Sequence, residues 1–419
     1  MISAGIVIIG AGQSAAVAAH ALREHGYRGR ITMLGRERHT PYERPPLSKA
    51  VLVALEEPSL HVLPEDSWKR CDIDLLSGSD AVALNLAQQQ VCLADGQVLE
   101  YEMCLLATGG EANKLACFPP SNRRAHYIRT IDDARRLRAA LQHKPRIAIL
   151  GGGFLGLELA HSSLAAGASV TVIERAASLL DRFLPPEAST CLHSNLREEG
   201  AQILLGDALR NVQSLPSDRM RLKTDTGVEL DVDEVIVAIG LSPNDALARD
   251  AGLAIAPGGG VLVDALCRTS NERVFACGDC TSQRRPGQTE PARLESWQNA
   301  NEQARTAAAA MLGAPPPAPV VPWFWTDQGK HNIQIIGLPA TDLAYVRRGD
   351  PATAKVLWIG HRRAVPVHAV AINAGGELRA IRPLVERGQP VALENFHVET
   401  VNLRAWVKQI LADPVVPAY

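Results

Sequence analysis

Gly10-Ala-Gly12-Gln-Ser-Ala15 is the stretch that decides the fold, and Gly151-Gly-Gly153-Phe-Leu-Gly156 repeats its pattern later in the chain. Each stretch follows a run of β-branched apolar residues and opens an alanine-rich segment that is typical of a helix. Such a turn needs glycine at the bend, glycine where the backbone approaches a pyrophosphate, and a small residue where the helix packs on the sheet. The helix N-terminus then faces the phosphates. Two copies in this context predict two dinucleotide sites.

Length and composition restrict the classes of protein to which the chain can belong. A chain of 419 residues with 46% hydrophobic side chains is expected to form two or three domains. Its net charge of −2 gives no overall bias toward nucleic acid or an anionic membrane, and we expect neither as a partner. The first apolar run, 6–22, lacks a basic leader and is broken by glycines, so it indicates a strand and a helix rather than a signal peptide. We expect a soluble, cytoplasmic protein.

Short apolar runs alternate with helical segments along the first part of the chain. This alternation predicts βαβ units and doubly wound parallel sheets. The runs that suit buried parallel strands are 6–9, 31–34, 103–107, 147–150, 170–173 and 235–238.

A proline-rich connector, 314–319, separates this region from the end of the chain. Residues 321–419 hold four of the six tryptophans and lack long alanine-rich helices. Runs 332–336 and 355–359 are typical of strands. These residues are therefore predicted to form a third, sheet-rich domain.

The residue after the second strand of each unit bears on the choice of nucleotide. Glu174 ends the strand after the second fingerprint, where a carboxylate binds ribose hydroxyls and favours NADH over NADPH, although Arg175 is adjacent. The alternative is an acid in a surface loop. After the first fingerprint, Arg36 stands where an acid is expected. Either Glu37 contacts the ribose, or the Arg36 guanidinium stacks on the adenine.

Five further segments carry a specific resemblance: 41–49 (PYERPPLSK), 106–109 (LATG), 276–279 (ACGD), 295–300 (ESWQNA) and 322–328 (PWFWTDQ). In order and spacing, from residue 5 to about 340, the chain resembles the FAD-dependent, NADH-oxidising ferredoxin reductases that serve Rieske oxygenases and some cytochromes P450. It is most similar to the putidaredoxin reductase and biphenyl dioxygenase reductase types.

The resemblance implies an α/β fold of the glutathione-reductase type, with two Rossmann-like dinucleotide-binding domains and a smaller C-terminal α+β domain. The expected boundaries are 1–115 and 241–320 for the two segments of the FAD-binding domain, 116–240 for the NADH-binding domain, and 321–419 for the sheet-rich domain near the flavin.

The resemblance also assigns the two fingerprints: the first holds FAD tightly, and the second binds NADH as a substrate. The residues expected to contact FAD are Gly10, Gly12, Ser14, Arg36, Glu37, Arg44, Lys49, Val82, Thr108, Gly109, Arg129, Asp279, Trp297 and Trp325. Those expected to line the NADH site are Gly151, Gly153, Leu155, Gly156, Glu158, Glu174, Arg182 and Gly240.

Three of these residues have a clear chemical role in such a site. The Asp279 carboxylate can accept hydrogen bonds from ribityl hydroxyls, and an ordinary helix N-cap is the alternative. The Lys49 ammonium can stabilise negative charge on reduced flavin, unless it is a solvated surface lysine. Glu158, placed in the first turn of the NADH helix, is expected to pair with Lys49 and to position the hydride donor. A carboxylate that only stabilises the helix dipole is the alternative. Lys49 and Glu158 are the predicted catalytic residues.

The implied activity is hydride transfer from NADH to FAD N5, followed by two single-electron transfers to a [2Fe-2S] ferredoxin. That ferredoxin would feed a Rieske dioxygenase or a P450 in aromatic hydrocarbon catabolism. A rubredoxin reductase, an NADH oxidase or a disulfide reductase is the alternative within the same fold. An interaction flavoprotein of the apoptosis-inducing type is the alternative from another class. The chain is expected to be a monomer or a homodimer.

The pair Cys277 and Cys280 can be interpreted in two ways. Cys277 and Cys280 have CxxC spacing, but no second ligand pair completes a zinc site, and no resident metal is expected. They form either a redox disulfide or a pair of idle thiols.

An acidic ferredoxin would dock on exposed basic residues, for which the candidates are Arg284, Arg285, Lys330, Arg347, Arg348, Arg362 and Arg363.

Overall fold

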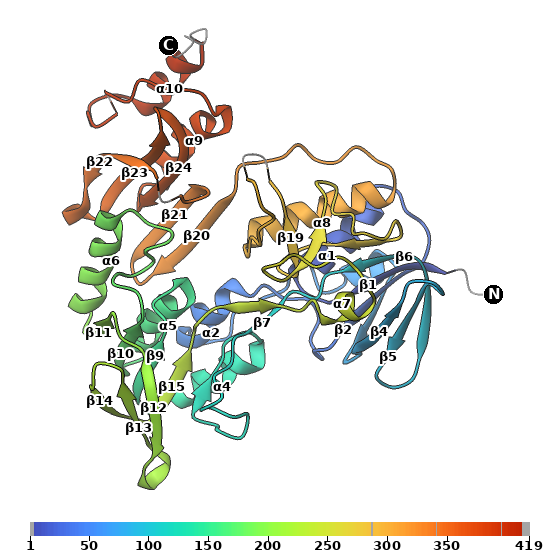
Figure 1. Cartoon of the computed structure of the whole chain (residues 1–419), viewed down its shortest axis with the longest axis horizontal. Helices are drawn as coiled ribbons and strands as arrows, with labels where there is room; N and C mark the ends of the chain where they lie inside the picture. Colours follow the sequence, from blue (N-terminus) through green and yellow to red (C-terminus); the bar gives the residue numbers. More distant parts are fainter. Residues whose placement is uncertain (1–3, 286–287, 341, 395, 413–419) are drawn as a thin grey trace. The chain divides into compact units, whose positions relative to one another are not determined.

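The computed structural model describes residues 4–285, 288–340, 342–394 and 396–412 (Figure 1). The chain forms two compact units. The first comprises Met1–Pro46, Pro58–Glu111 and Leu241–Pro319, and the second comprises Leu47–Glu57, Ala112–Gly240 and Val320–Tyr419. The segment 47–57 therefore groups with the second unit, although the sequence alone placed it within an unbroken first domain. The other domain boundaries stay predictions.

The first unit is built on a seven-stranded sheet in the order β3-β2-β1-β6-β5-β4, with β18 paired to β6. The neighbours β2 and β6 both run parallel to β1, as the apolar runs predicted. The strands are β1 (Gly5–Ile9), β2 (Ile31–Gly35), β3 (Ile73–Ser77), β4 (Ala81–Asn85), β5 (Gln90–Leu93), β6 (Val98–Leu106) and β18 (Val274–Ala276).

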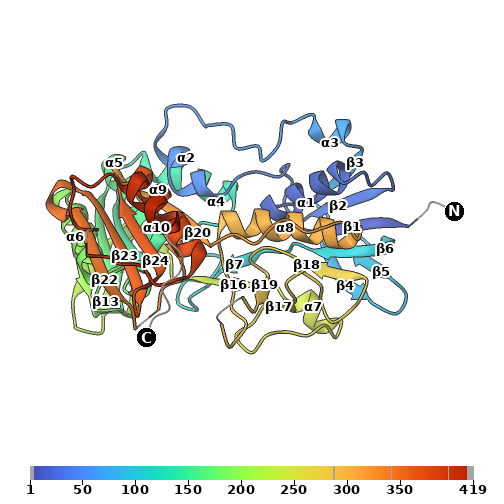
Figure 2. The ribbon, with the colours of Figure 1, turned by 90° about the horizontal axis from the view of Figure 1, so that it is seen from above.

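Both faces of β1 are covered, because successive side chains point to opposite sides of a strand. Ile6 and Ile8 pack against helices α1 (Gln13–Glu24) and α8 (Trp297–Met311), which lie side by side (Figure 2). Val7 and Ile9 face a second core, shared with α7 (Ala246–Asp250) and β17 (Val261–Val263). β17 pairs with β19 (Thr281–Gln283), and the unit also contains α3 (Ser67–Arg70) and β16 (Leu241–Pro243).

The second unit contains a five-stranded sheet in the order β11-β10-β9-β15-β8. Its pairings are all parallel, which confirms the prediction for the three runs in this region. An antiparallel sheet, β12-β13-β14, shares a core with it. The strands are β8 (Ala125–His126), β9 (Arg146–Leu150), β10 (Ser169–Glu174), β11 (Gln202–Leu205), β12 (Leu209–Ser214), β13 (Met220–Thr224), β14 (Glu229–Val232) and β15 (Glu234–Val237). The helices are α2 (Ala50–Val53), α4 (Ile131–Leu141), α5 (Phe154–Ala165) and α6 (Pro186–Glu198).

The C-terminal residues of the second unit form an antiparallel sheet in the order β20-β21-β24-β23-β22. Helix α9 (Gly375–Arg387) packs on this sheet and α10 (Leu403–Ala412) packs on α9, around Leu378, Ile381 and Phe396 (Figure 1). The two runs predicted as strands in this region are confirmed as parts of β21 and β23. The strands are β20 (Trp323–Gln328), β21 (His331–Gly337), β22 (Ala344–Asp350), β23 (Lys355–Arg362) and β24 (Val365–Ile372).

No helix in the described part of the chain is both long and apolar enough to cross a membrane. The longest helix there, α8, has 15 residues, whereas a membrane-spanning helix needs about 20. Within the same residue ranges, no group of three or more His, Cys, Asp or Glu side chains could hold a metal ion.

Candidate functional site

The first fingerprint forms a tight turn between β1 and α1. Gly10 has φ +123°, and a Cβ atom there would lie 2.1 Å from the carbonyl oxygen of Ala107. Gly12 differs: its φ is −98°, which any residue can adopt, and a Cβ atom there would meet no protein atom within 4 Å. Gly12 is also the N-cap of α1 and supplies no side-chain cap. Open space beside uncapped N–H groups suits a pyrophosphate, so the structure fits a bound dinucleotide.

Several predicted FAD contacts converge on this turn. Because Gly10 packs on Ala107, Thr108 lies beside it, and Thr108 donates a hydrogen bond of 2.6 Å to the Asn244 carbonyl. A Cβ atom at Gly278 would lie 2.7 Å from the Ser14 hydroxyl oxygen, so the loop carrying Asp279 packs on the first turn of α1.

The other predicted FAD contacts of the first unit differ in exposure. Gly109 has φ +65°, and Asp279 is half-buried. Trp297 begins α8 with 37% of its surface exposed, and Val82 is 57% exposed on β4.

The strand register places Gly35, Arg36 and Glu37 relative to the first fingerprint. Gly151 donates its N–H to Ile173, and Glu174 comes next; Gly10 donates its N–H to Leu34, and Gly35 comes next. Gly35 is therefore the backbone equivalent of Glu174, and Arg36 follows one residue later; the choice between Arg36 and Glu37 as the contact to the FAD adenosine stays a prediction. A Cβ atom at Gly35 would lie 2.7 Å from the Ala11 methyl carbon, which explains why no side chain stands there.

The two residues after Gly35 take different environments. Arg36 is exposed and pairs with Glu111 at 2.7 Å. Glu37 is half-buried and accepts hydrogen bonds from Tyr42, at 2.5 Å, and from Arg44, at 2.9 Å. Glu37 is thus a carboxylate held in place two residues after the end of β2.

The second fingerprint reproduces the geometry of the first. Gly151 has φ +107°, and a Cβ atom there would lie 2.4 Å from the Ala238 carbonyl oxygen. A Cβ atom at Gly156 would lie 2.0 Å from the Gly151 carbonyl oxygen, which explains the small residue. Gly153, the uncapped N-cap of α5, again has open space beside it. This turn fits a second dinucleotide.

Glu174 is held beside this turn at the carboxyl end of β10. Its Oε2 atom accepts the Gly152 N–H at 2.5 Å, and its Oε1 atom accepts the Ala176 N–H at 2.7 Å. The carboxylate is therefore oriented before any ligand arrives. Among the other predicted NADH contacts, Leu155 is half-buried, Arg182 is exposed over the Phe183 ring, and Gly240 is exposed with φ +104°.

Lys49 and Glu158 form an ion pair, with 2.9 Å between Lys49 Nζ and Glu158 Oε1. This pairing was predicted, but the position of Glu158 was not: α5 begins at Phe154, so Glu158 lies in the second turn rather than the first. The distance from the helix end weakens the alternative of a carboxylate that only stabilises the dipole. Two hydroxyls complete the contacts, since Ser48 donates to Oε2 at 2.5 Å and Thr326 donates to Oε1 at 2.6 Å.

Two other residues predicted to contact FAD lie in the second unit. Trp325 stacks on Trp323, with 5.0 Å between ring centroids and 18° between planes. The backbone N–H of Arg129 donates to Asp133 at the start of α4. Their contacts with FAD, like that of Lys49, stay predictions.

Cys277 and Cys280 are free thiols, and both are fully buried. Burial raises the pKa of Cys277 well above its ordinary value, and the neighbouring Cys280 adds to the rise. Burial also raises the pKa of Cys280. Both thiols are inaccessible and neither has the lowered pKa of a redox cysteine, which favours idle thiols.

Two of the predicted basic docking residues are not available to a partner. Arg285 donates to Asn299 at 2.8 Å and to the Ala292 carbonyl, and burial lowers its pKa. Arg348 is only 6% exposed and donates to four backbone carbonyls, those of Phe396, Val398, Glu399 and Val401. Both side chains therefore stabilise the fold through internal hydrogen bonds. Arg347 pairs with Glu187 and Arg362 with Asp342, while Arg284, Lys330 and Arg363 are exposed.

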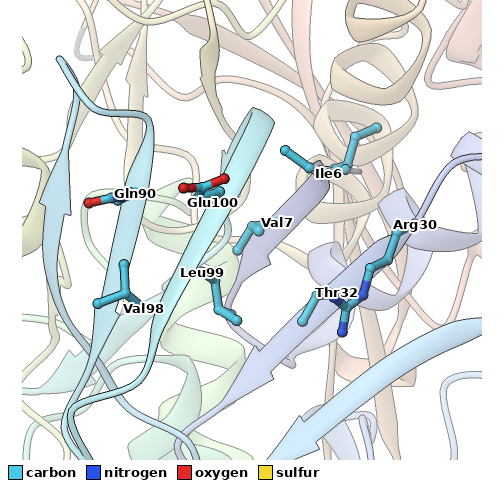
Figure 3. A pocket seen from close by; sticks show the side chains of 10 residues that line it. Ile6, Val7, Arg30, Thr32, Gln90, Val98, Leu99 and Glu100 are labelled. Atoms are coloured by element: carbon cyan, nitrogen blue, oxygen red, sulfur yellow. The ribbon is translucent and has the colours of Figure 1, made fainter. Parts of the chain in front are cut away.

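A hollow of about 320 Å³ lies at the other end of β1 from Gly10 (Figure 3). The amino ends of β1 and β2, together with β5 and β6, supply its lining. Two charged residues line it, Arg30 and Glu100, and Arg30 is already paired with Asp74 at 2.8 Å. Ligands of doubly wound sheets bind at the carboxyl ends of the strands, so this hollow is separate from the nucleotide sites.

Comparison with known proteins agrees with the fold. Residues 4–304 match the pyridine nucleotide-disulphide oxidoreductase family, and residues 323–407 match the reductase C-terminal family. The chain belongs to the pyridine nucleotide-disulphide oxidoreductase family. Like other members, it is an oxidoreductase that uses FAD and NAD(H).

Relatives within the family are similar over nearly the whole chain. A 3-phenylpropionate/cinnamic acid dioxygenase ferredoxin–NAD(+) reductase component from Photorhabdus laumondii is 40% identical over 379 residues, which are 90% of this chain and 95% of that protein. Putidaredoxin reductase, in its covalent complex with putidaredoxin, is 30% identical with a TM-score of 0.93, covering 99% of this chain and 100% of the other. The ferredoxin reductase for the CYP199A2 system of Rhodopseudomonas palustris is 32% identical with a TM-score of 0.91, covering 97% and 100%.

Sequence reasoning missed the two hydroxyls on Glu158. Ser48 and Thr326 both lie inside segments that carry the family resemblance, but neither was predicted as a site residue. The available signal was the alternation in β20, where Phe324, Thr326 and Gln328 fall on one face of the strand. What this face packs against could be known only from the tertiary structure.

Proposed function

We propose that this protein is an NADH-dependent reductase of a [2Fe-2S] ferredoxin that supplies electrons to a dioxygenase or a cytochrome P450. The main support is the 40% identity, over 90% of the chain, to a dioxygenase ferredoxin–NAD(+) reductase component. Similarity to reductases of putidaredoxin and of a P450 system agrees with it. An aromatic acid or hydrocarbon would be the final substrate of the oxygenase, in the cytoplasm.

The nucleotide sites support this activity in chemical terms. The first turn, with Ser14, Thr108 and Asp279 around it, has the open space and hydrogen-bonding groups that a resident FAD needs. FAD supplies the chemistry that joins a two-electron hydride donor to a one-electron acceptor. Glu37 and Arg44 would hold its adenosine ribose, in place of the missing side chain at Gly35.

The second unit binds and orients the hydride donor. Glu174 presents a fixed carboxylate to the adenosine ribose, which favours NADH and repels the 2′-phosphate of NADPH. The Lys49–Glu158 pair orients the nicotinamide, so that its hydride carbon is aligned when FAD is bound. No general acid or nucleophile is needed for such a step. Alignment of the reacting atoms at about 3 to 3.5 Å is the main requirement.

The buried cysteines argue against a disulfide reductase. Such an enzyme needs a reactive thiol pair, whereas Cys277 and Cys280 are protonated and inaccessible at neutral pH. An electron-transfer protein as acceptor is consistent with idle thiols.

The decisive experiment measures cytochrome c reduction by NADH, with and without a purified [2Fe-2S] ferredoxin, and with NADPH as the control donor. We expect a rate that depends on ferredoxin and is at least about tenfold higher with NADH than with NADPH. Rubredoxin, oxygen and a disulfide serve as alternative acceptors. Faster turnover with any of these, or slow NADH oxidation with every acceptor, would contradict the proposal.

A further inference from the structure

Strand β20 of the C-terminal sheet packs along helix α5 at matched intervals. The Phe324 and Phe154 rings have centroids 4.5 Å apart, and Thr326 bonds to Glu158. Two residues along a strand advance about 6.7 Å, and four residues along a helix advance about 6 Å. The spacing from Phe324 to Thr326 therefore matches the spacing from Phe154 to Glu158, and both contacts form in the same alignment. This match fixes the Thr326 hydroxyl opposite the Glu158 carboxylate.

The environment of Glu158 leaves its carboxylate little freedom. Glu158 is 7% exposed, Thr326 is 0% exposed and Ser48 is 3% exposed. One hydroxyl donates to each carboxylate oxygen, and Lys49 reaches Oε1 at 2.9 Å. Ser162, one turn further along α5, donates to the Ser48 carbonyl at 2.6 Å and so holds that donor in place. Hydrogen bonds to an ionised group are the strong ones, and here they set its orientation.

We propose that Thr326, with Ser48, is a positioning residue for hydride transfer: the hydroxyls hold Glu158 in the orientation that aims Lys49 at the nicotinamide. The C-terminal sheet would thus contribute to the NADH half-reaction through Glu158, without contacting the nucleotide through Thr326. This inference rests on the proposed function, because it assigns a role within NADH oxidation.

The test is stopped-flow reduction of the FAD-loaded protein by NADH, followed by flavin absorbance, in Thr326→Val, Thr326→Ser and Ser48→Ala variants. Valine keeps the shape of threonine without the hydroxyl, and serine keeps the hydroxyl. We expect Thr326→Val and Ser48→Ala each to lower the limiting reduction rate constant about tenfold, with Thr326→Ser within about twofold of the original protein. The NADH concentration at half-maximal rate should change less than about twofold, since Thr326 is fully buried and acts through Glu158.

A double-mutant cycle separates positioning from general damage to the fold. In a Glu158→Gln background, Thr326→Val should have little further effect, because Thr326 acts through Glu158. The matched control is Ser163→Ala, which removes a fully buried hydroxyl of α5 that has no hydrogen-bond partner in the described structure. It should leave the rate unchanged.

Three results would overturn the inference: an unchanged rate in Thr326→Val and Ser48→Ala, a Thr326→Ser variant as slow as Thr326→Val, or additive effects in the cycle. Ser48→Ala keeps the test open if Thr326→Val does not fold. Failure of the proposed function has a different signature. In that case the original protein itself would reduce no ferredoxin, whatever its rate of flavin reduction.

Discussion

Cys277 and Cys280 lie on either side of Asp279, and their state decides between an electron-transfer reductase and a disulfide reductase. A thiol reacts with alkylating reagents as the thiolate. Burial raises the pKa of both groups above the ordinary value of 9.0, so at pH 8 both remain protonated as well as inaccessible. Exposed Cys117 offers an internal reference.

We therefore expect native Cys277 and Cys280 to react with iodoacetamide at pH 8 at least about a hundredfold more slowly than Cys117, at a rate limited by local opening. Mass spectrometry of timed digests measures this ratio. Thiols counted in denaturant before and after NADH treatment should be equal. A gain of two thiols on reduction would instead reveal a working disulfide.

The residues around the nucleotide turns show what sequence spacing can and cannot predict. Spacing identified both fingerprints and Glu174, because these depend on local backbone geometry. It did not show that Gly35 is the backbone equivalent of Glu174, because only the pairing of β2 with β1 reveals this register. It also counted Arg285 and Arg348 as surface charges. Arg348 is buried against backbone carbonyls 48 to 53 positions away, and half-buried Arg285 donates to the Asn299 side chain, 14 positions away.

The strand-turn-helix element gives a prediction in which two glycines of one motif behave differently. Gly151 has a positive φ and no room for a Cβ atom, whereas Gly153 has an ordinary φ of −79° and open space beside it. The fold therefore requires Gly151, and only a ligand requires Gly153.

We expect Gly151→Ala to lower the free energy of unfolding by about 3 kcal/mol or more, from backbone strain and a clash with Ala238. Gly153→Ala should change it by less than about 0.5 kcal/mol. The same Gly153→Ala variant should raise the KM for NADH at least about tenfold, because the methyl group occupies the space expected for the pyrophosphate. Urea unfolding and steady-state kinetics measure the two effects. Equal losses of stability in both variants would contradict this division of roles.

Whole elements were easier to predict than the contacts between them. The apolar runs located three strands in each of the two parallel sheets and two strands of the C-terminal sheet, because buried strands have a strong local pattern. The packing of β20 on α5, and so the link from Thr326 to Glu158, left no comparable pattern. It arises from residues 168 positions apart in the chain.

At the scale of the whole molecule, the charge is nearly balanced, with a net value of −2. Any attraction to an acidic ferredoxin must therefore come from a local group of uncompensated cations. The structure reduces the number of predicted cations that remain candidates for docking. Arg285 and Arg348 bond internally, while Arg347 and Arg362 face Glu187 and Asp342. Arg284, Lys330 and Arg363 remain as exposed candidates.

Arg284→Glu should therefore raise the KM for ferredoxin about three- to tenfold at low ionic strength, with little change in kcat, because charges at the rim of an interface act mainly on association. Salt screens such charges, so the difference from the original protein should shrink as ionic strength rises toward about 0.5 M. Reduction of ferricyanide, which needs no docked protein, should stay the same and so control for damage to the nucleotide sites. Lys330→Glu and Arg363→Glu test the other two cations in the same assay. If all three variants keep the original KM at low salt, docking does not depend on these cations, and apolar contact must account for recognition of the ferredoxin.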